Sequence, residues 1–157
     1  MTDLDAPSSQ ARRQDWLAVL AHAPRALLAQ HAAAIDWTAL AWLREPEFGL
    51  AMLRGRIGGF GDRFNLGEAT ITRCVVRCAD DGRDTLGVGY VIGRDEERAR
   101  WVALFDARLQ QPAHHERLMA GVIEPLRAAV AAQRRQQRER TAASRVQFFT
   151  LQPEAAR

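Results

Sequence analysis

Three consecutive segments in which apolar and polar residues alternate constrain the fold of this chain most strongly. A two-residue period is typical of β-strands, and the Asp81-Gly82 dipeptide between the second and third segments is a hairpin signal. The positions that share a face are, segment by segment, Phe48, Leu50 and Met52; Leu66, Thr70, Thr72, Cys74 and Val76; and Leu86, Val88, Tyr90 and Ile92. The sequence therefore predicts a central antiparallel β-meander from about Glu47 to Gly93.

Helical periodicity flanks this meander on both sides. Before it, Trp16, Leu20, Ala23 and Leu27 recur at helical spacing, and Pro24 separates a first helix from a second. After it, two apolar stripes follow, one over 98–109 and one over 118–130, separated by Pro112. All four tryptophans are placed in helical stretches, with a packing role in a core or an interface; they are Trp16, Trp37, Trp42 and Trp101.

The predicted fold class is thus α+β, with N-terminal helices, a central antiparallel β-meander, C-terminal helices and a short extended tail. A length of 157 residues suits a single domain over 1–157, with 1–10 expected as a flexible N-terminus and 141–157 as the extended tail. Within that tail, Phe148 and Phe149 are adjacent, so we expect them to pack against a partner or a second copy.

The chain holds few residues suited to metal binding or disulfide formation. Cys74 and Cys78 lie four apart on one strand face, about 13 Å from each other, which is too far for a disulfide. We expect two reduced core thiols, no metal site and no cofactor of its own. No run of eighteen apolar residues and no secretory start are present, so we expect a cytoplasmic protein without a membrane partner.

The basic charge is carried by arginine alone. The formal net charge is +3, and all 22 basic residues are arginine. Arginine favours planar, bidentate contacts with carboxylates or phosphates. The stretch "AAQRRQQRERTAASR" continues the last helical stripe, and its simplest interpretation is a solvated helix face or a flexible approach to the tail. Nucleic acid or a partner's acidic surface is the alternative.

The stretch "LRGRIGGFGDRFNLGEATITRC", residues 53–74, contains the candidate site. Four of its glycines lie between Gly55 and Gly61, but no P-loop lysine follows, and no helix follows as a dinucleotide fingerprint requires. No catalytic acid, base or nucleophile set is evident, so the predicted role is contact with a partner or with phosphate. The candidate residues are Arg54, Arg56, Gly58, Gly59, Gly61, Arg63, Asn65, Glu68 and Arg73.

A longer pattern points to a family. The stretches "LREPEFGLAMLRGRIGGFGDRFNLGEATITRC", "GVGYVIGRDEERA" and "VQFFT" closely resemble the PhnG subunit of the bacterial carbon-phosphorus lyase core complex. The likeness extends from Trp16 to Leu151, which makes the chain a single PhnG-like domain. It implies partners of the PhnH, PhnI and PhnJ types and an oligomeric state within that complex.

The resemblance also implies a reaction. PhnI, working with PhnG and PhnH, displaces adenine from ATP with an alkylphosphonate and gives a ribose 1-phosphonate 5-triphosphate. After a diphosphatase step, PhnJ, a radical S-adenosylmethionine enzyme, cleaves the carbon-phosphorus bond. This chain would then be a non-autonomous, non-catalytic subunit of a transferase complex, and the hairpin a partner-binding surface, a contributor to a shared phosphate site or an internal turn. An autonomous basic nucleic-acid-binding protein is the alternative function.

Overall fold

The computed structural model describes residues 9–35, 37, 40–80 and 83–144 of the chain. In chain order the elements are α1 (Ser9–His22), α2 (Arg25–Ala33), β1 (Leu40–Arg56), the 3₁₀ turn η1 (Ile57–Gly59), β2 (Arg63–Asp80), β3 (Arg83–Ile92), α3 (Glu96–Leu109), α4 (Pro112–Leu118), the π-helical turn η2 (Met119–Ile123) and α5 (Glu124–Ala143). Helices precede and follow a three-stranded sheet, so the predicted α+β fold is confirmed.

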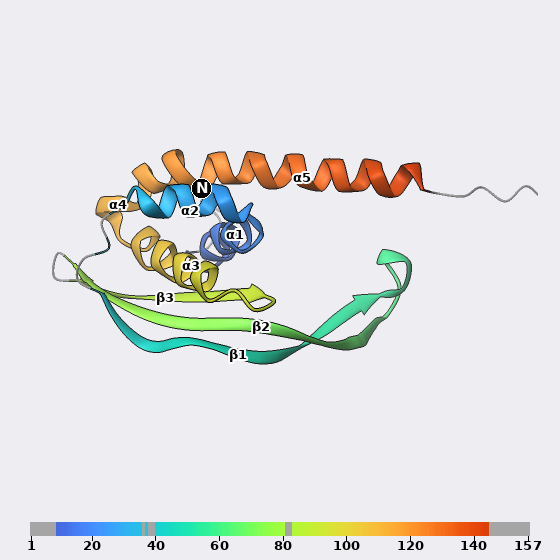
Figure 1. The fold of residues 1–157 in the computed structure, drawn as a ribbon, viewed down its shortest axis with the longest axis horizontal. Helices are drawn as coiled ribbons and strands as arrows, with labels where there is room; N and C mark the ends of the chain where they lie inside the picture. The colour runs from blue at the N-terminus through green and yellow to red at the C-terminus, as the bar shows by residue number, and fades with distance from the viewer. Residues whose placement is uncertain (1–8, 36, 38–39, 81–82, 145–157) are drawn as a thin grey trace, which may run out of the picture.

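The sheet is an antiparallel meander in the order β1-β2-β3, as the sequence predicts. Asp80 pairs with Arg83, so β2 and β3 form a hairpin around the Asp81-Gly82 position, which itself lies outside the described residues. The helices lie on one face of the sheet, and the hairpin of β1 and β2 extends past them and curves back toward the side of α5 (Figure 1).

β1 begins at Leu40, seven residues before the predicted start of the sheet. Trp42 therefore lies in a strand, opposite Val76 of β2, and Trp37 lies between α2 and β1; the helical placement of these two tryptophans was wrong. Pairing with β2 overrides the local periodicity, and Pro46 is tolerated because β1 is an edge strand with register irregularities around it. The expected packing role holds for Trp37, whose ring meets that of Phe105 edge to face.

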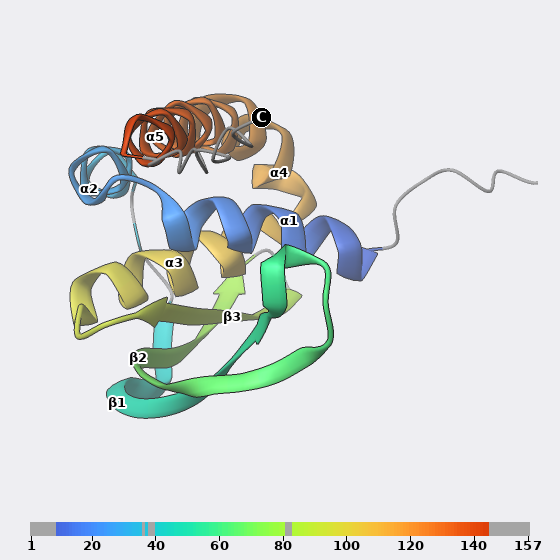
Figure 2. The ribbon, with the colours of Figure 1, turned by 90° about the vertical axis from the view of Figure 1, so that its right-hand side faces the viewer.

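The helix α3 lies directly on the sheet because β3 presents glycines to it. A Cβ added at Gly87 would lie 1.9 Å from the carbonyl oxygen of Ala103, and one added at Gly89 would lie 2.1 Å from that of Ala99. α1 lies between α3 and α5, which is the element farthest from the sheet (Figure 2). The larger side chains that alternate over 86–92 therefore do not form part of the core. Leu86, Tyr90 and Ile92 are exposed on the face of the sheet away from the helices.

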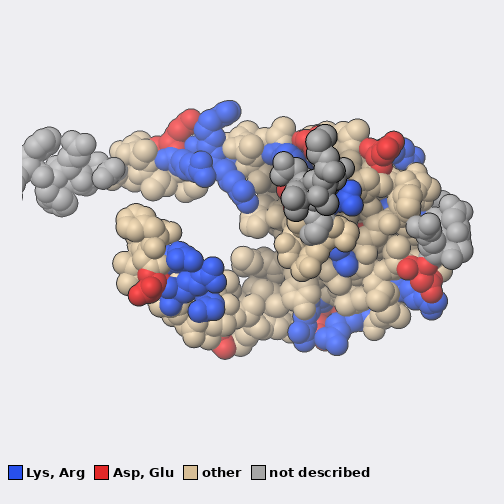
Figure 3. Space-filling view, turned by 180° about the vertical axis from the view of Figure 1, so that it is seen from behind, with Lys and Arg blue, Asp and Glu red and all other residues tan. Residues whose placement is uncertain are grey.

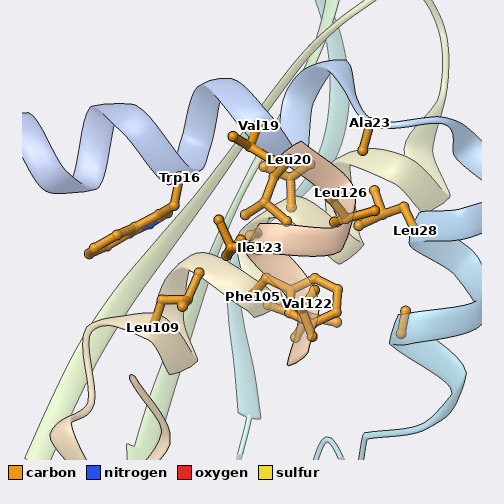
Figure 4. Close-up of a cluster of buried hydrophobic side chains, with 14 of the residues drawn as sticks. Trp16, Val19, Leu20, Ala23, Leu28, Phe105, Leu109, Val122, Ile123 and Leu126 are labelled. Atoms are coloured by element: carbon orange, nitrogen blue, oxygen red, sulfur yellow. The ribbon is translucent and has the colours of Figure 1, made fainter. Parts of the chain in front are cut away.

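The hydrophobic core lies between the helices and extends to the covered face of the sheet (Figure 4). Phe105, Leu20, Leu28, Ile123 and Leu126 are fully buried in it. Over the second half of β2 the even-numbered residues face this core, as the alternation predicts; they are Thr72, Cys74, Val76 and Cys78.

The two cysteines are free and buried, which confirms the expectation of reduced core thiols. Burial is the main cause that raises the pKa of the Cys74 thiol to about 11. Because this pKa lies far above neutral pH, Cys74 is a packing residue and not a reactive thiolate.

Asp106 is a buried carboxylate that joins three elements. It accepts hydrogen bonds from Arg13 Nε at 3.1 Å and Nη2 at 2.6 Å, from Trp16 Nε1 at 2.9 Å and from the backbone N–H of Val88 at 2.9 Å. α1, β3 and α3 are therefore held together by one fully buried side chain.

The ends of the described chain differ in part from expectation. α1 begins at Ser9, so residues 9–10 are helical, although 1–10 were expected as a flexible terminus. α5 continues to Ala143, which confirms that the last helix runs on but makes 141–143 helical and not part of the tail. Residues 1–8 and 145–157, with Phe148 and Phe149, lie outside the described residues.

Candidate functional site

The candidate site is the end of the β1–β2 hairpin, where three arginines share one face. Directly opposed residues are Arg54 with Asn65, Gly55 with Phe64, and Arg56 with Arg63. Opposed residues in an antiparallel pair point to the same side of the sheet, and side chains alternate along each strand. The arginines and Asn65 therefore lie on one face, while Phe64 lies on the other against Gly55.

Glycines shape the turn between the two strands. Gly58 and Gly59 have φ angles of 61° and 86°, a left-handed conformation that L side chains rarely adopt. The N–H of Gly61 donates to the Ile57 carbonyl at 2.8 Å, and a Cβ at Gly61 would lie equally close to that oxygen. The guanidinium of Arg56 donates to the Gly61 carbonyl at 3.2 Å, which ties the arginine to the turn. The glycine spacing therefore serves a tight turn.

A β-bulge separates this tip from the rest of the hairpin. Leu53 opposes Gly67 whereas Arg54 opposes Asn65, so Leu66 is an extra residue on β2. Gly67 has a φ of 148°, which suits the irregular backbone at such a point. A bulge bends its strand and increases the local twist, and Figure 1 shows that the β1–β2 hairpin is curved.

The structure brings together all the predicted site residues except Arg73. Arg73 lies opposite Glu47, well before the tip, and its Nε donates to the Glu47 carboxylate at 2.7 Å. Hydrogen bonds from Arg73 and from Arg44 hold the pKa of Glu47 below its usual value. Glu47 is an odd position of β1 whereas Arg54 and Arg56 are even positions, so Glu47 and the opposed Arg73 lie on the side of the sheet away from the arginine face. Glu68 opposes Met52 and so lies beside the arginine face.

Large apolar side chains are exposed along the same hairpin, although their sequence alone did not identify them as a surface. Phe60 at the turn is 89% exposed, Ile57 70% and Leu50 65%. Phe48, Met52, Phe64 and Leu66 are exposed as well. Their alternation was visible in the sequence, but the absence of a covering helix could be seen only in three dimensions. Apolar and arginine-rich surfaces of this kind are typical of protein interfaces.

The last helix carries a second basic surface. Arg134, Arg135 and Arg138 line a shallow groove between α1 and α5, together with Asp15 and Val19 among others. In the space-filling view, basic side chains of this helix and of the hairpin border the same hollow (Figure 3). Tertiary structure thus brings near to each other two segments about 75 residues apart in the chain.

Comparison with known proteins decides the family. Residues 11–152 match the family described as "Phosphonate metabolism protein PhnG". The chain belongs to the PhnG family. A relative from Rhizobium meliloti (strain 1021), the alpha-D-ribose 1-methylphosphonate 5-triphosphate synthase subunit PhnG, is 43% identical over 142 residues, which are 90% of this chain and 88% of the relative. The matched region of this PhnG-family chain includes both the hairpin and all of α5.

Two further kinds of feature are absent from the described residues. Among its residues, no three or more His, Cys, Asp or Glu side chains gather in a way that could hold a metal ion. None of its helices combines the length and apolarity needed to cross a membrane. The hairpin of this PhnG-family chain presents arginine guanidinium groups, glycine backbone and exposed apolar side chains.

Proposed function

We propose that this chain is a non-autonomous subunit of an alpha-D-ribose 1-methylphosphonate 5-triphosphate synthase within a carbon-phosphorus lyase complex. The observation that carries this proposal is the 43% identity, over 90% of the chain, to a PhnG subunit of a synthase with that name. In this role the chain supports a PhnI-type subunit, which transfers ribose 5-triphosphate from ATP to an alkylphosphonate and releases adenine. PhnH-type and PhnJ-type subunits are the further partners of the complex.

The hairpin supplies the contact in this proposal. Its tip combines Phe60 and Ile57, which are mostly exposed, with Arg54 and Arg56 on the arginine face. Burial of apolar surface at about 25 cal/mol per Å² would give the contact its strength. Guanidinium groups would give it specificity through paired hydrogen bonds to carboxylate or phosphate oxygens. A shared phosphate site on a PhnI-type subunit is compatible with the same geometry.

The chemistry itself belongs to the partners in this proposal. Purified alone, the chain should neither hydrolyse ATP nor release adenine, because nothing in its sequence forms an acid, base or nucleophile set. It needs no cofactor of its own and works in the cytoplasm, where ATP is at hand. Adenine release by the isolated chain, after removal of every trace of PhnI-type protein, would contradict this assignment.

The test is reconstitution with the other subunits, in which assembly and phosphonate-dependent adenine release are measured separately. Gly59→Val strains a backbone at positive φ, and Arg54→Ala with Arg56→Ala removes two guanidinium groups. We expect each change to weaken assembly, and we expect Arg117→Ala, an exposed arginine on α4, to leave it unchanged.

The two measurements separate the possible roles of the hairpin. Lost assembly supports the interface role, whereas intact assembly with lost turnover supports contact with the substrate phosphates. If all hairpin variants assemble and turn over normally, the hairpin is only a turn. If the unmodified chain does not assemble with the other subunits at all, the proposed function itself is wrong.

A further inference from the structure

Two arms extend past the helical body on either side of a hollow (Figure 3). The hairpin arm comprises residues 48–68 of β1, η1 and β2, and the helix arm comprises residues 131–143 of α5. Figure 1 shows the hairpin arm curving toward the side on which the helix arm runs.

The helix arm is exposed along its whole length, although its first half borders a groove beside α1. Every residue from 131 to 143 is exposed, and this stretch contains four arginines against one glutamate. A short helix that is polar on all sides is marginal in water unless it packs against something. Arg134, Arg135 and Arg138 lie on the side of α5 that borders α1, and none of the three makes an ion pair with a described residue. Figure 3 shows basic side chains of α5 at the border of the hollow, so the helix arm presents positive charge toward it.

The inner face of the hairpin arm is apolar at its base and basic at its tip, and Glu68, opposite Met52, adds a carboxylate between the two. Phe48 opposes Thr72, which is fully buried on the helix-covered side of β2, so Phe48 lies on that same side of the sheet. Alternation along β1 places Leu50 and Met52, and then Arg54 and Arg56, on this side as well. These apolar side chains are exposed because the helices do not reach them.

A like-charge pair closes the tip. Arg56 and Arg63 are directly opposed across the two strands, an arrangement that destabilises an isolated hairpin. Neither arginine makes an ion pair with a described residue. Both guanidinium groups would be stabilised by an anionic group bound between the arms.

We infer that the hollow binds an acidic, amphipathic segment of a partner protein. The inference rests on the proposed function of the hairpin, to which it adds the helix arm and the chemistry of the partner. Apolar side chains of the segment pack on Phe48, Leu50 and Met52, and its carboxylates pair with the arginines of both arms. The apolar base of the hairpin arm favours a protein over a nucleic acid, because Leu50 and Met52 are aliphatic and offer neither charge nor hydrogen bonds to a phosphate backbone.

The experiment measures the affinity of the full-length chain for the remaining subunits of the synthase at 100 and 500 mM NaCl. One variant removes charge from the helix arm, Arg134→Ala with Arg138→Ala, and another from the hairpin arm, Arg54→Ala with Arg56→Ala. We expect each to weaken binding about tenfold at 100 mM NaCl and clearly less at 500 mM, because exposed ion pairs are screened by salt. Alanine preserves the helix arm, since it is the strongest helix former.

Matched variants distinguish charge from structure. In the helix arm, Arg134→Glu with Arg138→Glu should weaken binding more than the alanine variant, and Arg134→Lys with Arg138→Lys should retain most of it, because the sign of the charge decides the effect. The double variant Arg12→Ala with Arg117→Ala removes the same charge from exposed positions outside both arms and should bind as the unmodified chain does.

Each outcome supports or overturns the inference. The inference is supported if variants of both arms bind the partner subunits more weakly, and if the loss of affinity in the helix arm increases from the lysine to the alanine to the glutamate variant. Helix-arm variants that bind normally, or that lose no more than the Arg12 and Arg117 control, overturn it while leaving the proposed function intact. If a 20-nucleotide oligo(dT) displaces the partner subunits from the hollow, and if its own binding is weakened by the same arginine variants, the surface is reassigned to nucleic acid. Failure of the unmodified chain to assemble removes both proposals.

Discussion

Replacing Asp106 should destabilise the chain more than any comparable change of a surface carboxylate. The side chain is fully buried and accepts four hydrogen bonds, from Arg13, Trp16 and the backbone of Val88. In Asp106→Ala, the Trp16 Nε1–H and the Val88 N–H lose their acceptor inside the protein. Each such unsatisfied donor costs about 1 to 3 kcal/mol.

The guanidinium group of Arg13 contributes less to this cost. Its side chain is 33% exposed, so it can turn partly toward water when the carboxylate is removed. Adding the two buried donors and a smaller share for Arg13, we expect a loss of about 3 to 5 kcal/mol, the range found when one partner of a buried pair is removed. Such a loss is a large fraction of the stability of an ordinary domain.

Urea unfolding followed by circular dichroism at 222 nm measures this loss. Asp15→Ala serves as the matched control, because Asp15 pairs with Arg127 at the surface and such pairs contribute less than about 1 kcal/mol. Asp106→Asn keeps one acceptor oxygen and should fall between the two, which keeps the test informative if Asp106→Ala does not fold. If the free energy of unfolding of the Asp106→Ala variant lies within about 1 kcal/mol of that of the unmodified chain, the reasoning is refuted.

Three further predictions follow from individual residues. Gly89→Ala places a Cβ 2.1 Å from a backbone carbonyl of α3 and should cost more than about 2 kcal/mol in urea unfolding, whereas Gly121→Ala, with nothing within 4 Å, should cost less than about 1 kcal/mol. Because burial raises the pKa of Cys74 to about 11, a thiol reagent at pH 8 should label it only after unfolding; rapid labelling of the folded chain would contradict its burial. A hydrogen bond from Arg127 lowers the pKa of Asp15, so this pair should stabilise the fold above about pH 3.8 and lose its effect as the pH falls through the lowered pKa; Asp15→Asn should reduce the acid sensitivity measured between pH 5 and 2.

Much of the fold follows from short-range patterns. Alternation and the Asp-Gly turn signal are local properties of the chain, and they predict the antiparallel meander and the core-facing positions of β2 correctly. Prediction failed at Trp37 and Trp42, because pairing of β1 with β2 outweighs the helical spacing around them. The missing P-loop lysine and the missing helix exclude two known phosphate cradles from the sequence alone, whereas the positive φ angles of Gly58 and Gly59 show in the structure that these glycines form a turn.

The composition of the candidate site could be predicted only in part. Three of its four arginines meet at the tip, and the fourth, Arg73, is separated from them by the register of β1 against β2 and by the side of the strand on which it lies.

Only the tertiary structure decides which apolar residues stay exposed. A two-residue period distinguishes the two faces of a strand but says nothing of how far a helix reaches along them. That reach depends on where α3 docks, which Gly87 and Gly89 permit by letting its backbone approach β3. The placement of α5 opposite the hairpin depends in turn on packing among α1, α3 and α5, so the basic hollow arises from contacts between segments that no local pattern relates.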